Sequence, residues 1–205
     1  MINKNLVDFV KNKRCTLLCA GPMSKNFVDS CIEYTRNKNF PLMLIASRRQ
    51  IDADDFGGGY VNNWTTETFS NYVKKRSNGK IILCRDHGGP FQGNKSSNSE
   101  KAIKDEMRTA KISFKADIDN NFEILHIDPS LNLGKNAFKK SIDRLFELYD
   151  YCWSYARKKN KKIAFEIGTE EQSGSTNSPE ELELTLELTE KFCKKNNFPM
   201  PMFVV

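Results

Sequence analysis

The segment Ile81-Ile82-Leu83-Cys84-Arg85-Asp86-His87-Gly88-Gly89-Pro90 joins a short apolar run to a polar, glycine-rich end. Four apolar or β-favouring residues in succession predict a strand that is buried in a sheet. The pair Asp86-His87 follows at the strand end, and the two glycines after it would let a ligand or a metal ion approach the backbone closely. We therefore expect a strand whose carboxyl end carries chemistry.

The same pattern recurs along the chain. Six short apolar runs predict strands: Thr16–Ala20, Leu42–Ala46, Ile81–Cys84, Ile124–Ile127, Ile163–Ile167 and Phe203–Val205. Longer segments of helical period separate them: Ser24 to Asn37, Thr65 to Asn78, Ser99 to Ala116, Ala137 to Lys159, and a last helix from Pro179 with Leu182, Leu186 and Phe192 facing inward. This alternation predicts an α/β fold with a parallel sheet that is covered on both faces.

The length limits how the sheet can close. A (β/α)₈ barrel typically takes about 250 residues, whereas this chain of 205 residues contains about six βα units. We therefore expect one domain, residues 1–205, with an incomplete TIM-barrel-like (β/α) repeat. The remaining units would come from another chain or a longer parent sequence, or else the sheet is open with a different wrapping.

Composition excludes several classes of protein. Hydrophobic residues make up 39%, charged residues 28%, and the mean hydropathy is −0.59, so the chain is neither disordered nor membrane-spanning. No secretory signal is recognised at the N-terminus, and six scattered cysteines without a C-x-x-C pair read as reduced thiols. We expect a cytoplasmic protein.

The net charge of +6 is an indication of solubility more than of a binding partner. The densest basic run, Arg157–Lys162, lies where a long helix should end, and cations there complement the helix dipole. No face combines basic and aromatic residues in the way nucleic-acid binding requires. We expect neither a nucleic-acid nor a membrane partner.

Candidate functional residues gather at the predicted strand ends. Asp86 and His87 follow the third strand, and Glu166 ends an otherwise apolar fifth strand, where a carboxylate needs a partner, a metal ion or a wet cavity. His126 and Asp128 are two residues apart and share a strand face. For His126, a hydrogen-bonded core residue and a contact to substrate or metal remain alternatives.

Two arginines follow the second strand directly. Arg48 and Arg49 could clamp an anionic group of a substrate. The alternative is a salt bridge to Asp52, Asp54 or Asp55. No nucleotide-binding glycine motif, nucleophile elbow, H-E-x-x-H or kinase motif is present.

Four motifs in order resemble the tagatose-bisphosphate aldolase accessory-subunit family, over roughly Leu17 to Val205. They are Gln50 with Gly58-Gly59-Tyr60, Asp86-His87-Gly88-Gly89-Pro90, His126-Ile127-Asp128-Pro129-Ser130, and Glu166-Ile167-Gly168-Thr169-Glu170. Three positions depart from the family pattern: Arg85 stands where a small residue is expected, and Arg48-Arg49 replace a more neutral pattern.

The resemblance implies a TIM barrel related to class II aldolases. It implies that Asp86 is a catalytic acid/base, that His87 is a metal ligand, and that Glu166 is a further ligand or orients one. The metal would be a divalent ion, and zinc is the expected one. Asp128 and Glu166 join Asp86 as candidate catalytic carboxylates, and the candidate substrate-binding residues are Arg48, Gln50, Tyr60, His126 and Ser130.

Two functions are compatible with these residues. The first is a metal-dependent sugar or sugar-phosphate enzyme of the aldolase or epimerase kind, in which a carboxylate moves a proton beside a carbonyl group. The second is a non-catalytic subunit that binds and stabilises a partner aldolase. A homo-oligomer is a further possible assembly.

Overall fold

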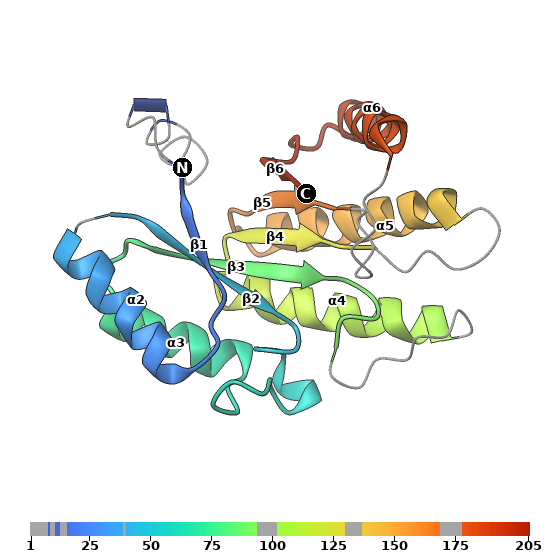
Figure 1. The fold of residues 1–205 in the computed structure, drawn as a ribbon. Coiled ribbons are helices and arrows are strands. Elements are labelled where there is room, and N and C mark those ends of the chain that lie inside the picture. Colours follow the sequence, from blue (N-terminus) through green and yellow to red (C-terminus); the bar gives the residue numbers. More distant parts are fainter. Residues whose placement is uncertain are drawn as a thin grey trace.

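The computed structural model describes residues 8, 11–12, 16–38, 40–93, 102–129, 137–168 and 178–205. Strands and helices alternate along it (Figure 1). The strands are β1 (Leu18–Ala20), β2 (Leu42–Ser47), β3 (Ile81–Gly88), β4 (Ile124–Ile127), β5 (Ala164–Ile167) and β6 (Phe203–Val204). The helices are α2 (Lys25–Lys38), α3 (Thr66–Arg76), α4 (Ile103–Asp119), α5 (Ala137–Lys158) and α6 (Pro179–Asn196), with a short 3₁₀ turn η1 (Asp54–Phe56).

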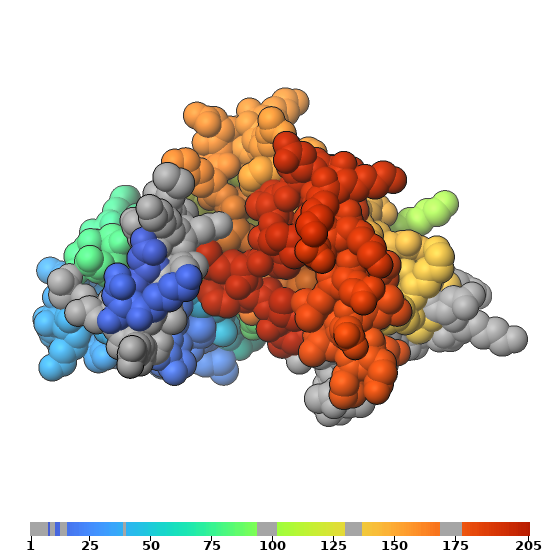
Figure 2. Space-filling view, turned by 90° about the horizontal axis from the view of Figure 1, so that it is seen from above, coloured from blue at the N-terminus to red at the C-terminus, as the bar shows by residue number. Residues whose placement is uncertain are grey.

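The six strands form one parallel sheet in the order β1-β2-β3-β4-β5-β6. Every strand pairs with its neighbour in sequence, which distinguishes this sheet from a doubly wound one, where the order reverses. The sheet curls into a half-barrel (Figure 1). The prediction of an α/β fold with an incomplete barrel-like sheet is confirmed to this extent. Seen from above, the segment around β1 and α2 lies on one side and α6 with the C-terminal residues on the other (Figure 2).

Local sequence explains the helix starts. Thr65 and Thr68 form a capping box at α3, in which each side chain accepts from the backbone N–H of the other residue. At α6, the Ser178 hydroxyl accepts from the Glu181 N–H, and Pro179 occupies the first turn. The sequence predicted these helices from Thr65 with Thr68 and from Pro179.

The main core lies between the convex face of the sheet and the helices. Leu44, Leu125 and Phe165 project from the strands into it, and the Tyr149 ring lies 3.9 Å from that of Phe165. The concave face carries a separate small cluster of Met43, Cys84, Ile124 and Ala164. The apolar strands predict a sheet covered on both faces; among the described residues, helices cover the convex face and strand side chains line the concave one, as in a curled sheet.

Helix α6 also departs from expectation. Leu182 and Leu186 are each 41% exposed, whereas Thr185, Thr189 and Cys193 are buried. Only Phe192 of the three predicted inward residues packs against the core. The helix turns a face of small side chains inward, which lets its backbone approach the core closely.

None of the described helices is long and apolar enough to span a bilayer.

Candidate functional site

Three polar side chains lie in a row on the concave face of the half-barrel. His126 on β4 is in register with Glu166 on β5, so the two side chains share a face. Asp86 on β3 brings Oδ1 to 3.7 Å from His126 Nδ1. Burial and the carboxylates of Glu166 and Asp86 raise the pKa of the Cys19 thiol on β1, which faces the same interior. Three consecutive strands thus bring acidic and imidazole groups together.

Asp86 is held in its ionised form. Partial burial acts to raise the pKa of this carboxyl, but the His126 imidazole 3.7 Å away and the fields of His87 and Arg85 outweigh it, so the pKa lies below its usual value. The side chain is 29% exposed. A carboxylate of this kind is available as a proton acceptor at neutral pH.

His87 is oriented at both ends. Its backbone N–H donates to His126 Nδ1 at 3.3 Å, and its ring Nδ1 lies 2.8 Å from Asp128 Oδ2. Gln92 donates to the same carboxylate oxygen at 2.9 Å, and Asp128 is almost completely buried. A buried carboxylate in this position fixes the orientation of the imidazole.

The sheet register explains why both Asp86 and His87 reach this region. Pairing between β3 and β4 shifts between Arg85 and Gly88, and His87 has a φ of +41°. In a regular strand these neighbours would point to opposite faces. The irregularity lets Asp86 face His126 while the His87 ring reaches Asp128.

The turn after His87 is tightly packed. A side chain at Gly89, whose φ is +155°, would collide with the Asp128 carbonyl oxygen. Arg48 Nη1 donates to the Gly89 carbonyl at 2.8 Å, and the Glu106 carboxylate accepts from the Phe91 N–H at 3.0 Å. The second glycine of the motif is therefore required by packing against the backbone of Asp128, which directly follows β4.

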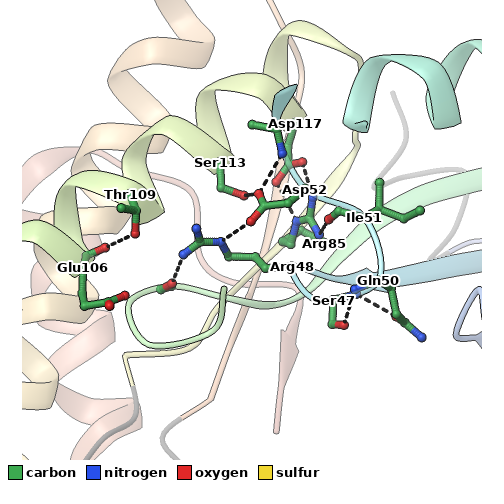
Figure 3. Close-up of polar contacts among 12 residues, drawn as sticks. Ser47, Arg48, Gln50, Ile51, Asp52, Arg85, Glu106, Thr109, Ser113 and Asp117 are labelled. Carbon is green, nitrogen blue, oxygen red and sulfur yellow. Dashed lines mark hydrogen bonds and ion pairs between the residues drawn. The ribbon is translucent and has the colours of Figure 1, made fainter. Parts of the chain in front are cut away.

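Arg48 forms a salt bridge with Asp52, which is the second of the two alternatives predicted for it. Its Nε donates to Asp52 Oδ2 at 3.1 Å, and Ser113 donates to the other oxygen of that carboxylate at 2.7 Å (Figure 3). The Arg48 side chain is 2% exposed. Its guanidinium stabilises the turn after β3 through the hydrogen bond to the Gly89 carbonyl, and it is buried away from the concave face.

Sequence reasoning missed the role of Arg85. This residue projects from β3 to the convex side, where Nε and Nη2 donate to the Asp117 carboxylate at 2.8 and 2.6 Å (Figure 3). Its Nη1 donates to the carbonyls of Ala46 and Ile51. Both charged side chains are fully buried. The available signal was an arginine in an apolar strand and an aspartate on the buried stripe of the following helix.

The other predicted substrate contacts lie apart from this row or outside the described residues. Gln50 Oε1 accepts from the Ser47 N–H at 2.9 Å, and its Nε2 lies 3.2 Å from Met23 Sδ. The Tyr60 hydroxyl lies 3.8 Å from the same sulfur, and Tyr60 is 56% exposed. Both thus lie beside the end of β1. Ser130 lies outside the described residues, as do Thr169 and Glu170.

The described donors do not by themselves fit a resident metal ion. His87 directs Nδ1 to Asp128, and Asp86 faces His126. Within the described ranges, no three His, Cys, Asp or Glu side chains converge closely enough to hold one. We derive no step through a metal ion.

Comparison with known proteins places the fold. No protein-family model matches the sequence, and no curated protein does so either. A crystal structure of a probable tagatose 6-phosphate kinase from Sinorhizobium meliloti 1021 matches with a TM-score of 0.66 and 18% identity, over 89% of this chain and 46% of that one. A fructose-bisphosphate aldolase from Campylobacter jejuni matches with a TM-score of 0.58 and 14% identity, over 94% and 54%.

A putative fructose-1,6-bisphosphate aldolase from Coccidioides immitis matches with a TM-score of 0.54 and 15% identity, over 90% of this chain and 56% of that one. The chain thus spans about half the length of the solved structures that it matches. At these identities the likeness is one of fold.

Proposed function

We propose that this chain acts on a sugar or sugar phosphate as an aldolase- or epimerase-type protein that moves a proton beside a carbonyl group. The observation that carries the proposal is the Asp86 carboxylate, kept ionised within 3.7 Å of His126 on the concave face. The His87–Asp128 pair lies next to it. The carboxyl ends of parallel strands are where barrel enzymes place their chemistry.

The chemistry follows from the charge of these groups. Asp86 would accept the proton from the carbon next to the carbonyl, while the electrons of that C–H bond move to the carbonyl oxygen and form an enediolate. Returning the proton to the opposite face of that carbon gives the epimer. In the aldolase direction, the base takes a hydroxyl proton as the C–C bond breaks. His87, with Nδ1 directed to the Asp128 carboxylate, would place Nε2 near the developing charge and would donate a hydrogen bond there when the ring is protonated.

The fold comparisons support this proposal at a coarser level. Two of the matched structures bear aldolase names, and the third is named a probable kinase of tagatose 6-phosphate. All three names refer to phosphorylated sugars. The identity of the sugar for this chain follows from none of them, so the test uses a panel.

The test is proton exchange from solvent into substrate. Ketoses, ketose phosphates and uronates are incubated with the protein in D₂O, and deuterium incorporation at carbon is followed by NMR. We expect one class to exchange with the wild type and not with Asp86→Asn. Asp105→Asn is the matched control, because Asp105 is an exposed partner of Arg108 on α4. Equal exchange by Asp86→Asn and the wild type would rule out this role of Asp86.

A non-catalytic subunit remains the second candidate. The observation in its favour is the surface of α6, where Leu182 and Leu186, about one helical turn apart, are each 41% exposed. Exposed apolar side chains of this kind are typical of a protein interface. If the chain binds an aldolase encoded nearby and raises its thermal stability, and a double substitution of these two leucines by serine abolishes both effects, the accessory function is supported. Unchanged binding by that variant would exclude this surface.

A further inference from the structure

Helices α4 and α5 enclose an open groove on the outside of the half-barrel. The groove has a volume of about 600 Å³, and the two helices that form it pack against each other (Figure 1). Its apolar lining consists of Met107, which is 6% exposed, and of the half-buried side chains of Ile103 and Tyr151. Because both helices lie on the convex side of the sheet, the groove is separate from the candidate site on the concave face.

Cations line this groove at helical spacing. Lys104, Arg108 and Lys111 follow one another at i, i+4 and i+7 on α4, so they form one row along the helix. Arg144 on α5 adds a fourth cation. Among the described lining residues, Glu147 is the one carboxylate. The groove therefore combines an apolar lining with an excess of positive charge.

The ion pairs that these cations form are exposed. Lys111 Nζ lies 2.6 Å from Glu147 Oε1, and both side chains are partly exposed. Arg108 pairs with Asp105 at 2.7 Å, where both side chains are more than 60% exposed. Exposed ion pairs contribute little to stability, because water competes for both charges. The cations can therefore exchange these partners for the carboxylates of a docked helix without a large loss.

Helix α6 carries the complementary pattern on a face that its own chain leaves exposed. Leu182 and Leu186 lie at i and i+4 and are each 41% exposed. A row of glutamates lies beside them, with Glu183, Glu187 and Glu190 at i, i+4 and i+7. Between residues 179 and 190 the helix has five glutamates and no lysine, arginine or histidine. This face is therefore apolar and strongly acidic.

The two patterns agree in spacing as well as in charge. On α4 an apolar residue precedes each of the first two cations of the row, and on α6 a leucine precedes each of the first two glutamates. Both charged rows span seven residues, which is about 10.5 Å along a helix. Glu187 and Glu190 pair with Lys191 and Lys194 at exposed positions, so these partners are also exchanged at little cost.

We propose that the groove between α4 and α5 binds helix α6 of a second copy of this chain. The leucines would lie on the apolar lining, and the glutamate row would face the cation row of α4. The α6 helix of the same chain is held elsewhere, because the Phe192 ring stacks on that of Phe146 at 4.2 Å. Complementary charge on two surfaces of one chain is the reason to choose a second copy as the occupant. The proposal is independent of the proposed function.

Sedimentation velocity over a concentration series tests the self-association. We expect the wild-type chain to sediment faster as its concentration rises from about 1 μM to about 1 mM. The association should weaken when NaCl is raised from about 0.05 M to about 0.5 M, because salt screens exposed charges. A wild type that stays monomeric over the whole series would overturn the proposal, as would an association that is insensitive to salt.

Two charge-reversed variants test the two surfaces separately. The groove variant carries Lys104→Glu and Arg108→Glu, and the α6 variant carries Glu183→Lys and Glu187→Lys. Each variant alone is expected to raise the dissociation constant of self-association by at least about tenfold, because like charges then face one another. Circular dichroism verifies that each variant is folded. Association of either folded variant with unchanged affinity would overturn the proposal.

The matched control reverses two exposed cations on a distant helix. Arg36→Glu with Lys38→Glu changes the last turn of α2 and gives the same net charge as the groove variant. We expect this control to associate like the wild type. A loss of association as large as that of the groove variant would mean that net charge, and not the groove, controls the assembly, and the proposal is then wrong.

Mixing the groove variant with the α6 variant tests whether the two surfaces bind each other. In the mixture the new lysines of one variant meet the new glutamates of the other, and the unaltered α6 meets the unaltered groove. We expect the equimolar mixture to associate, although each variant alone does not. Two folded variants that stay apart on mixing would overturn the pairing.

An aldolase is the alternative occupant of the same leucines, under the second candidate function. The arm that separates the two occupants measures aldolase binding by the wild type and by the α6 variant. A wild type that is monomeric, and that binds an aldolase which the α6 variant does not bind, would assign this face to the aldolase and overturn the proposal.

Discussion

The guanidinium of Arg85 donates two hydrogen bonds, of 2.8 and 2.6 Å, to the Asp117 carboxylate. This ion pair lies on the convex side of β3, and Asp86 is the next residue of that strand. The same guanidinium binds the carbonyls of Ala46 and Ile51. One buried cation therefore links β2, β3 and α4 behind the candidate site. The position of the Asp86 carboxylate depends on this network.

Removing the charge of Asp117 should destabilise the fold strongly. Asp117→Asn leaves the fully buried Arg85 guanidinium without a counter-charge, and loss of one partner of a buried pair typically costs about 3–5 kcal/mol. Urea unfolding measures the effect. The control Asp105→Asn breaks an exposed pair and is expected to change the free energy of unfolding by less than about 1 kcal/mol. Similar small losses in both variants would contradict the importance of the buried pair.

Asp86→Asn should remove activity without removing stability to the same extent. We expect proton exchange to fall by about 10²–10⁴-fold, the usual contribution of a positioned acid or base. The asparagine keeps the shape of the side chain, so the melting temperature should stay near that of the wild type. Exchange rates and thermal melts measured on the same samples decide between loss of chemistry and loss of fold.

The lowered pKa of Asp86 predicts a pH-dependent contribution to stability. A carboxyl whose pKa is lower in the folded than in the unfolded chain stabilises the fold above its unfolded pKa of about 4. That contribution is lost as the pH falls through the folded pKa. The difference in unfolding free energy between wild type and Asp86→Asn should therefore be constant from pH 7 to about pH 5 and shrink below about pH 4. A difference that grows on acidification would contradict the lowered pKa.

Gly89→Ala should displace Asp128 and thereby the His87 ring. The new β-carbon would collide with the Asp128 carbonyl at a positive φ, so we expect a loss of about 3 kcal/mol and a shifted His87 imidazole signal. Gly79→Ala is the matched control, since Gly79 has a φ of +77° but open space around it. It should cost only the backbone strain, about 1 kcal/mol. Equal effects at the two positions would show that strain, and not the collision, is the cause.

Local patterns were sufficient to predict the order of elements. The apolar runs correspond to the six strands, and Thr65 and Pro179 correspond to the starts of α3 and α6. These features depend on neighbouring residues only, because a capping side chain binds a backbone N–H within one turn. The proximity of Asp86, His87, His126 and Asp128 was also predictable, since the carboxyl ends of parallel strands meet at one edge of a sheet.

Long-range packing determined the rest. Whether Arg48 meets a substrate or Asp52, and whether Arg85 projects inside or outside the half-barrel, depends on the curl of the sheet and on where α4 lies against it. The exposure of Leu182 and Leu186 has the same origin, because the rotation of α6 about its axis is set by its neighbours. The close approach of the His126 ring on β4 to Gly168, which follows β5, is a further example. No local pattern encodes such a distance, because it exists only once strands far apart in the sequence pair in register.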